Sequence, residues 1–461
     1  MTVKKKLTLI DWIKDRMERM LFNGVKFIIP KRATNPLSFL GMLTFMDFLL
    51  LGITGALLTI YYTPTIELNI ANKTFVSPWD SVKTINDVIA FGYILRNIHY
   101  HASNAMVLLA LLHLSYQLFS GRYKLKNELI WVTGVIFGLV TILEAYSGYD
   151  LIVNVRAQLA MNVGRGLALS TPYLGDMIAE LLFGPGSLSS MVLHLYAFHI
   201  FLLPFIMVLL AIFHFPRNLT LDIPMVSIIF GIIFIIAGMY PIELGVKFSP
   251  FYPAPVTVPE WYLTALYAFL RTGLSPFIVG VLIPTLYIVI AAIIPFLDKS
   301  RGFKISDRPL VIAIGVTGLV QFAFFTIWGF QGTYPWIPLM PLPGQETELL
   351  FLDPITTFAV WGALIIICTI AVYAYAHNQK RKLSKPGAHS KIMNGGSDKT
   401  KTISPNRILI GLVSLITLQI FLTIITFIAY LINLQQVALI TLGGILITFG
   451  VIYHFYRLMS T

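Results

Sequence analysis

The chain has 461 residues, of which 57% are hydrophobic and 12% are charged, and its mean hydropathy is +0.79. This composition excludes an ordinary soluble globular protein and indicates a polytopic membrane protein. The formal net charge of +12 does not indicate nucleic-acid binding, because nothing in the sequence suggests a fold that presents a basic patch, and we expect no nucleic-acid partner.

The first 37 residues are basic and amphipathic. Trp12, Ile13 and Met17 recur at helical spacing among charged residues, which predicts a helix lying along the cytoplasmic surface of the membrane. We expect no cleavable signal peptide here, because the segment is amphipathic and lacks the apolar stretch of such a signal.

Ten apolar runs of membrane-spanning length follow. An isolated strand cannot satisfy its backbone hydrogen bonds in lipid, so we predict an all-α protein with about ten transmembrane helices. The predicted spans are 38–62, 93–119, 130–149, 189–215, 225–241, 276–297, 309–329, 355–376, 407–433 and 436–456.

These runs divide the chain into regions. We expect a four-helix bundle in residues 38–223 and four further helices in residues 224–376. The stretch 377–406 is rich in Lys, Arg, Gly and Ser, which predicts a polar cytoplasmic linker before two additional helices in residues 407–461.

The basic residues predict the orientation in the membrane. With ten helices both termini lie on one side, and 26 of the 33 Lys and Arg residues fall in the segments on that side. The positive-inside rule then places both termini in the cytoplasm. We expect the plasma membrane of a prokaryote.

Four histidines stand in pairs on two predicted helices, His99 with His113 and His199 with His214. A fourteen-residue step advances ~21 Å along a helix and returns to within ~40° of the starting face. The fifteen-residue step of the second pair misses that face by ~60°, which a kink at Pro204 could adjust. Two such helices side by side would form two histidine couples at two depths.

Neutral imidazole is a natural axial ligand of haem iron, and two imidazoles leave no open site for oxygen. The pattern therefore predicts two haems and a role in electron transfer. Each histidine taken alone could instead be a hydrogen-bonded residue of the bundle interior.

Four glycines repeat the fourteen-residue step. Gly41 and Gly55 lie on the first predicted helix, and Gly134 and Gly148 lie on the third. We predict that they let a flat macrocycle approach the backbone at the two depths of the histidine couples. Ordinary packing of small residues between helices is the alternative.

Cys368 is the only cysteine in the sequence. It excludes, on this chain, a disulfide, a covalent haem site and a cysteine-ligated iron–sulfur cluster. Any haem is therefore expected to be b-type and held by coordination alone.

Motifs in a characteristic order accompany the histidine and glycine pairs, namely Leu95–His99, Thr171–Gly175, Ala197–Phe205 and Pro259–Tyr262. On these residues the chain resembles cytochrome b of the quinol-oxidising cytochrome bc complexes, over about residues 38–376. The fifteen-residue histidine spacing is similar to the photosynthetic branch, in which this core is split into cytochrome b6 and subunit IV. The resemblance is thus to a fused, prokaryotic form with two extra C-terminal helices.

The resemblance implies that His99 and His199 ligate the haem near the outer face, and that His113 and His214 ligate the haem near the cytoplasm. Arg96 matches the family's arginine that pairs with a haem propionate.

The resemblance also places Glu260 in an outer quinol-oxidation pocket, where it would accept a quinol proton and pass it on. Tyr262 and Tyr149 match positions of the same pocket and complete the catalytic candidates. An interfacial glutamate beside an aromatic anchor is the alternative for Glu260.

The sequence departs from the family pattern at two places. His194 stands where the family has a second propionate-binding arginine, and Asp150–Asn154 replaces the Pro-Trp-Gly-Gln that follows Tyr149 in the family. The second departure alters the wall of the quinol pocket.

Two acids within predicted spans, Asp47 and Glu144, are costly in lipid and are expected to face the bundle or water. A proton route and a hydrogen-bonded structural acid are equally open for both. Arg217 and Asp222 lie on the side where the family reduces quinone.

The resemblance implies bifurcated quinol oxidation. One electron goes to a Rieske iron–sulfur protein, and the other crosses the membrane through the outer and then the inner haem to reduce quinone. Further respiratory subunits or a terminal oxidase, and a homodimer, are also implied, and we expect the two extra helices to dock a partner. A dihaem membrane anchor of a dehydrogenase or hydrogenase, without bifurcation, is the main alternative, and a haem-free transporter is another.

Overall fold

The computed structural model describes residues 9–20, 26–28, 35–124, 126–215, 218–252, 257–330, 353–383 and 405–459. The predicted amphipathic segment contains α1 (Leu9–Met20), whose Trp12 ring packs against Phe296 with centroids 6.1 Å apart. Arg217 and most of the predicted linker lie outside the described residues.

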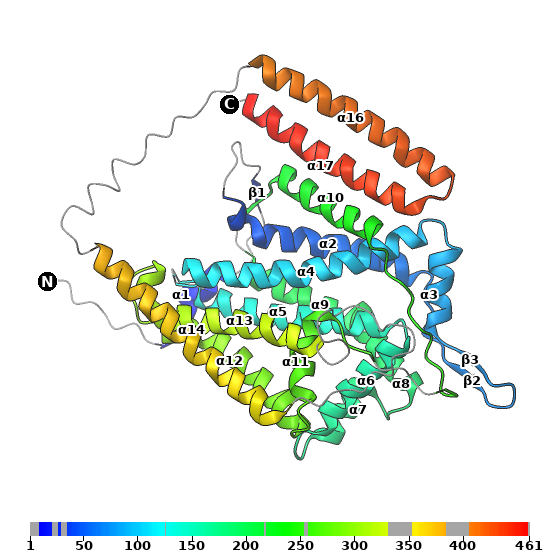
Figure 1. The fold of residues 1–461 in the computed structure, drawn as a ribbon, viewed down its shortest axis with the longest axis horizontal. Coiled ribbons are helices and arrows are strands. Elements are labelled where there is room, and N and C mark those ends of the chain that lie inside the picture. The colour runs from blue at the N-terminus through cyan, green and yellow to red at the C-terminus, as the bar shows by residue number, and fades with distance from the viewer. Residues whose placement is uncertain are drawn as a thin grey trace.

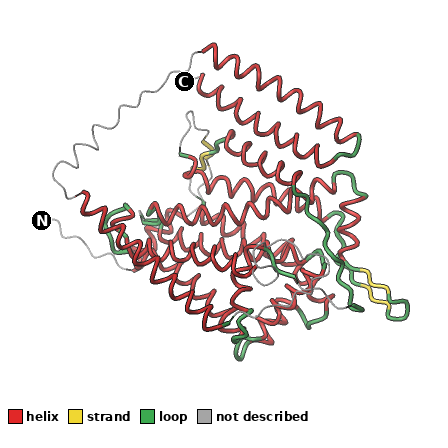
Figure 2. The backbone as a smooth tube through the Cα atoms, in the orientation of Figure 1, coloured by secondary structure: helices red, strands yellow, loops and turns green. Residues whose placement is uncertain are grey.

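All ten predicted spans are helical, so the all-α polytopic prediction is confirmed (Figures 1 and 2). Among the described residues, nine helices are long and apolar enough to cross a membrane. The remaining predicted span forms the shorter apolar helix α10 (Ile223–Met239).

Strands are short in the described part of the chain. β1 (Lys26–Ile28) pairs in parallel with β4 (Asn218–Thr220), and β2 (Glu67–Asn69) pairs antiparallel with β3 (Thr74–Val76). The β2–β3 hairpin projects from one end of the molecule, at the right of Figure 2.

The bundle consists of four helices that are apolar around most of their circumference, as expected for helices buried on one side and facing lipid on the other. They are α2 (Leu40–Thr59) after the short η1 (Pro36–Phe39), α4 (Gly92–Ser120), α5 (Glu128–Asp150), and a fourth helix built from α8 (Leu188–Ala197), η2 (Phe198–Leu202) and α9 (Leu203–His214).

The fourth helix contains one π-helical turn, η2, which carries His199 and directly precedes the turn with Pro204. Proline has no N–H to donate to the preceding turn, and a π-helical turn accommodates one additional residue. His199 and His214, although fifteen residues apart, therefore lie on one face of the helix, as residues fourteen apart do in a regular helix. The spacing is thus adjusted by a π-helical turn next to Pro204, where we had considered a kink at Pro204.

Several short helices cover the end of the bundle nearest His99. They are α3 (Pro78–Asp87), α6 (Val155–Leu169), α7 (Gly175–Phe183) and α11 (Trp261–Leu270). Glu260 is the N-cap residue of α11, so this helix begins beside the bundle.

The remaining helices pack on two sides of the bundle (Figure 1). On one side lie η3 (Phe277–Leu282) continuing into α12 (Ile283–Leu297), then η4 (Ile305–Asp307), α13 (Pro309–Phe330) and α14 (Pro354–Leu383). On the other side α10 packs on α2 and α4, followed outward by α17 (Gln435–Met459) and α16 (Pro405–Leu431).

Of the two additional helices, α17 joins the rest of the chain through glycines. A Cβ on Gly443 of α17 would lie 2.5 Å from the carbonyl oxygen of Gly231 on α10, so the two backbones are in contact. At one end of this contact Arg457 forms a buried ion pair with Asp222, with 3.1 Å between Nη1 and Oδ2. Helix α17 is therefore packed on its own chain.

A polar clamp joins the halves of the chain at the end of α4 that is far from His99. Arg308, which is 2% exposed, donates to the carbonyls of Leu118 and Phe119 at 2.9 and 2.6 Å. Asp298 accepts a hydrogen bond from Tyr123 and pairs with Lys124 at 3.0 Å. The clamp fixes the loop between α12 and α13 against α4.

Candidate functional site

The four histidines form two couples inside the bundle. The ring centroids of His99 and His199 are 6.3 Å apart, and so are those of His113 and His214. The ring planes are nearly perpendicular in both couples, at 89° and 84°. Each couple combines one residue of α4 with one of the fourth helix, as the spacing predicted.

Both couples fit the axial positions of a haem. Half of the 6.3 Å separation is about 3 Å, which suits a metal bonded at about 2 Å to a ring nitrogen lying about 1 Å from each ring centre. Within the described residues no cluster of three or more His, Cys, Asp or Glu could hold a metal ion. Two imidazoles that face each other are the donor set that holds haem iron in a b-type site.

Each predicted glycine lies against one of the four imidazoles. A Cβ would come within 2.8 Å of His113 at Gly41, 3.1 Å of His99 at Gly55, 2.7 Å of His214 at Gly134 and 2.5 Å of His199 at Gly148. The glycines thus leave room for the histidine rings beside the backbones of α2 and α5. Contact of the macrocycle with these backbones stays a prediction.

Three of the four histidines are oriented by hydrogen bonds of Nδ1. The Nδ1 of His99 lies 2.9 Å from the Thr54 hydroxyl, and that of His214 lies 3.2 Å from the Thr133 hydroxyl. The Nδ1 of His199 lies 3.3 Å from the Ser147 hydroxyl and 3.1 Å from the Glu144 backbone carbonyl, with the Glu144 carboxyl Oε1 at 3.2 Å as an ion-pair contact. For His113, no described residue is a partner of Nδ1.

These partners follow a local sequence repeat that the spacing analysis did not use. A hydroxyl residue directly precedes three of the four glycines, in Thr54-Gly55, Thr133-Gly134 and Ser147-Gly148, whereas Leu40 precedes Gly41. The residue just before three of the four glycines could therefore have identified a hydroxyl partner of the histidine from the sequence.

Arg96 lies one turn before His99 and is 9% exposed. Its guanidinium donates to the Asn86 side chain at 3.0 Å and to the carbonyls of Ile242 and Glu243 at 2.8 and 3.0 Å. In this arrangement Arg96 ties the start of α4 to the segment that follows α10. Its contact with a haem propionate stays a prediction.

Glu260 is 5% exposed and is paired with Arg156, an arginine that the sequence analysis did not single out. Arg156 Nη1 lies 2.9 Å from Glu260 Oε1, and its Nε donates to the Val258 carbonyl at 2.8 Å. The Tyr100 hydroxyl lies 3.4 Å from both carboxylate oxygens of Glu260. Because Tyr100 directly follows His99 in α4, the acid stands near the outer histidine couple.

The two tyrosine candidates lie in the same region as Glu260. Tyr149 packs near the Arg156 guanidinium, 6.0 Å from ring centre to Cζ, and its hydroxyl is buried without a partner among the described residues. Burial, and next the charge of Glu260, raise the pKa of Tyr262 well above its usual value, so that its hydroxyl stays protonated. The structure thus brings together Glu260, Tyr149, Tyr262 and Arg156.

The remaining polar candidates do not lie together at one site. Asp47 is fully buried in α2, and neither carboxylate oxygen has a hydrogen-bond partner in the described part of the chain. Glu144 contacts His199 and therefore belongs to the outer histidine couple. His194 bonds through Nδ1 to the Ser190 carbonyl of its own helix at 2.8 Å.

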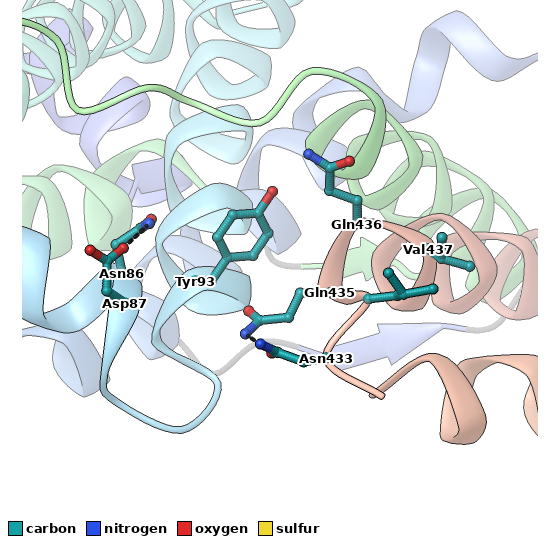
Figure 3. Close-up of a pocket in the computed structure, with 8 residues that line it drawn as sticks. Asn86, Asp87, Tyr93, Asn433, Gln435, Gln436 and Val437 are labelled. Carbon is teal, nitrogen blue, oxygen red and sulfur yellow. Dashed lines mark hydrogen bonds between the residues drawn. The ribbon is translucent and has the colours of Figure 1, made fainter. Parts of the chain in front are cut away.

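A cavity of about 420 Å³ lies away from the histidines (Figure 3). It opens between the start of α4 and the turn that joins α16 to α17, where Tyr93 faces Asn433 and Gln435. This cavity is separate from the site built around Glu260.

Comparisons with known proteins cover both halves of the chain. Residues 28–219 match the family model for cytochrome b/b6/petB, and residues 250–344 match the model for the C-terminal part of cytochrome b, b6/petD. The first range contains all four histidines, and the second contains Glu260.

Relatives and a solved structure agree with these matches. The chain is 27% identical to the cytochrome b of Sulfolobus acidocaldarius over 504 residues, covering 95% of this chain and 83% of the relative. It is 30% identical to the cytochrome b6 of Prochlorococcus marinus over 209 residues, covering 44% of this chain and 91% of the relative. A solved chain described as a hyperthermophilic respiratory Complex III has a similar fold, with a TM-score of 0.55, 20% identity, and coverage of 80% of this chain and 96% of that one.

Proposed function

Because the chain belongs to the cytochrome b family of membrane electron-transport proteins, we propose that it is the cytochrome b subunit of a quinol-oxidising respiratory complex. The observation that carries the proposal is the combination of two histidine couples, each 6.3 Å between ring centres, with the buried Glu260–Arg156 pair next to the outer couple. A protein that only carries electrons needs the two histidine couples and no more. A quinol-oxidising site also needs a group that accepts protons.

The residues would divide the work between electrons and protons. His99 and His199 would hold the outer b haem, and His113 and His214 the inner one. The haems, when bound, supply one-electron redox chemistry, and the chain supplies their position and surroundings. Gly41, Gly55, Gly134 and Gly148 make room for the imidazoles.

At the outer site, oxidation of a quinol releases two electrons and two protons. Glu260 would accept one proton, since it is a buried carboxylate with Tyr149 and Tyr262 in the same region. Arg156, whose Nη1 lies 2.9 Å from Glu260 Oε1, would hold the carboxylate in place. Tyr100 would keep the carboxylate directed towards the outer histidine couple.

The reaction would be bifurcated. One electron would leave to a Rieske iron–sulfur partner, because this chain has no cysteine cluster that could take it, and the other would cross to an inner quinone site. The complex would contain a homodimer of this chain, with further respiratory subunits or a terminal oxidase. We place it in a prokaryotic plasma membrane with both termini in the cytoplasm.

A reduced-minus-oxidised absorption spectrum of the purified protein, combined with the haem-to-protein ratio, tests the assignment. We expect a b-type α-band and two haems per chain. Absence of the band would exclude the proposal and leave the transporter hypothesis.

The dihaem anchor is distinguished by a second measurement. In the assembled complex, Glu260→Gln should slow quinol-dependent reduction of the high-potential acceptor at least tenfold while both haems remain bound. An unchanged rate would favour the anchor, because an anchor has no use for a proton acceptor at this position.

A further inference from the structure

We propose that the cavity between the start of α4 and the turn joining α16 to α17 binds the uncharged, hydroxyl-rich headgroup of a membrane lipid, such as a single hexose. Its volume of about 420 Å³ falls within the range of small-molecule sites, about 300–1,000 Å³. None of its lining residues belongs to the histidine couples or to the Glu260–Arg156 pair, so the site stands apart from the proposed electron transfer.

The cavity lies at the level of a membrane surface. The candidate membrane spans of α4 and α17 begin at Gly92 and Gln435, and that of α16 ends at Leu431. The cavity opens beside these three helix ends, which is the depth at which lipid headgroups lie. A lipid of the surrounding bilayer can therefore reach the cavity with its headgroup.

Apolar side chains border the polar cavity. Leu434 and Val437 belong to its lining, and Ile432 in the same turn is exposed. Phe91 stacks on Tyr430 with ring centres 4.6 Å apart and ring planes 5° apart, which holds the two walls together. The exposed apolar residues offer a surface along which hydrocarbon chains can lie, as a lipid requires and a free sugar does not.

Polar side chains face one another across the cavity (Figure 3). Asn86 and Asp87 lie on one side, Tyr93 stands in the middle, and the other side carries Asn433, Gln435 and Gln436. Asn86 Nδ2 donates to Asp87 Oδ1 at 3.0 Å, and Gln435 Nε2 donates to Asn433 Oδ1 at 2.9 Å. These hydrogen bonds stay within one wall, so they fix the side chains of each wall and leave the space between the walls open to a ligand.

Two buried polar atoms of the lining have no hydrogen-bond partner among the described residues. They are the hydroxyl of Tyr93 and the Oε1 of Gln435. Burial of such atoms without a partner is costly, so a ligand that supplies partners is favoured. An amide oxygen can only accept a hydrogen bond, whereas a phenol both donates and accepts. A hydroxyl-rich ligand suits both, because each of its hydroxyls is donor and acceptor in one atom.

The charge of the lining favours an uncharged ligand. Neither Lys nor Arg is among the described residues that line the cavity, and Asp87 is their one acid. Hydrogen bonds from Asn86 and from Lys83, which lies outside the lining, lower the pKa of Asp87, so this acid is ionised at neutral pH. A phosphate or sulfate would meet this carboxylate and the Gln435 oxygen without a cation in the cavity to balance its charge. A neutral sugar avoids this repulsion.

The test is lipid binding to the full-length protein, purified in a detergent that has no sugar groups and stripped of lipid. The probes are glucosyl diacylglycerol, phosphatidylglycerol and phosphatidylcholine with the same acyl chains, and free glucose. We expect glucosyl diacylglycerol to bind and to raise the midpoint of thermal unfolding, because a ligand of the folded state stabilises that state. Both phospholipids should bind at least about tenfold more weakly.

Two variants connect this binding to the cavity. Tyr93→Phe removes only a hydroxyl, and Gln435→Leu removes only the amide, so each should weaken the binding of glucosyl diacylglycerol about fivefold, as expected for one lost hydrogen bond. Tyr456→Phe and Gln419→Leu are the matched controls on α17 and α16, outside the lining, and should leave the affinity unchanged. Tyr93→Phe keeps the ring and its packing, so it decides the question if Gln435→Leu fails to fold.

Equal affinity for the glycolipid and the two phospholipids, or an affinity that stays unchanged in both variants, would overturn the inference. Equal affinity for free glucose would overturn the assignment to a lipid, and the ligand would then be a soluble sugar. The proposed function fails by a different result, which is the absence of a b-type α-band. The two failures are therefore distinguishable, because lipid binding is measured without any electron transfer.

Discussion

Arg156 and Glu260 form an ion pair of 2.9 Å between the start of α6 and the N-cap of α11. The Glu260 side chain is 6% exposed and the Arg156 side chain 31%, so the pair runs from the interior of the protein towards its surface. The Val258 carbonyl fixes the guanidinium through Nε. Arg156 thereby determines where the proposed proton acceptor lies.

Replacement of Arg156 by Gln should reduce quinol oxidation. Without the guanidinium the carboxylate loses its counter-charge and its fixed orientation, and we expect kcat/KM to fall at least tenfold, about 1.4 kcal/mol in activation free energy. Arg156→Lys should retain part of the rate, because it keeps the charge but not the second hydrogen bond. The measurement is quinol-dependent reduction of the high-potential acceptor. Arg165→Gln, on the same helix, is the control, and equal rates in both Gln variants would contradict the prediction.

A methyl group at Gly148 should displace the ligand beside it. The Cβ of Gly148→Ala would lie 2.5 Å from His199, and overpacking of this kind costs about 1–3 kcal/mol. We expect the haem-to-protein ratio to fall from about two towards one. Gly138→Ala in the same helix is the matched control, because nothing lies within 4 Å of its added Cβ. Equal haem content in the two variants would count against the role of Gly148.

Arg457→Met should release the C-terminal helices. It would leave Asp222 buried at 2% exposure without its ion-pair partner, and breaking a buried pair from one side costs about 3–5 kcal/mol. We expect faster proteolysis in the part of the chain that connects α10 to α17, and a lower midpoint of thermal unfolding. The double variant Asp222→Asn with Arg457→Met should recover most of the stability, because the asparagine is neutral and can still cap α10. If the double variant does not recover stability, the unpaired charge is not the cause of the loss in Arg457→Met.

Asp298 predicts an acid-dependent loss of stability. Burial raises its pKa, but hydrogen bonds from Tyr123, Ser300 and Lys124 outweigh this effect, and the pKa lies below its usual value. A lowered folded-state pKa contributes stability that is complete above the unfolded value of about 3.9 and is lost as pH falls through the folded value. Thermal unfolding of the wild type and of Asp298→Asn should differ by a constant amount above about pH 5. The difference should shrink below about pH 4, and a difference independent of pH would exclude the mechanism.

The sequence predicted the helices well because lipid imposes a simple rule. A backbone that crosses hydrocarbon must satisfy its own hydrogen bonds, so ten long apolar runs imply ten helices. Only α10 fell short of spanning length in the structure. The face shared by His99 and His113 was equally predictable, because residues on one helix are related by its fixed rotation per residue.

The π-helical turn at His199 was not predictable from that rule. The fifteen-residue interval signalled a distortion, and Pro204 marked its place, but the kind of distortion depends on how α8 and α9 pack against α5. Similarly, the hydroxyl residues before three glycines are visible in the sequence. Their role as histidine partners depends on each glycine lying beside an imidazole, which the packing of the helices decides.

By itself, then, the sequence determined the membrane-spanning helices, the two histidine pairs and the glycines at the same step, because these are periodic within single helices. Only the tertiary structure decided that Arg156 pairs with Glu260, that Glu144 reaches His199 and that α17 packs on α10. Such contacts join elements far apart in the chain. They depend on the distances and angles at which helices pack, which local spacing does not contain.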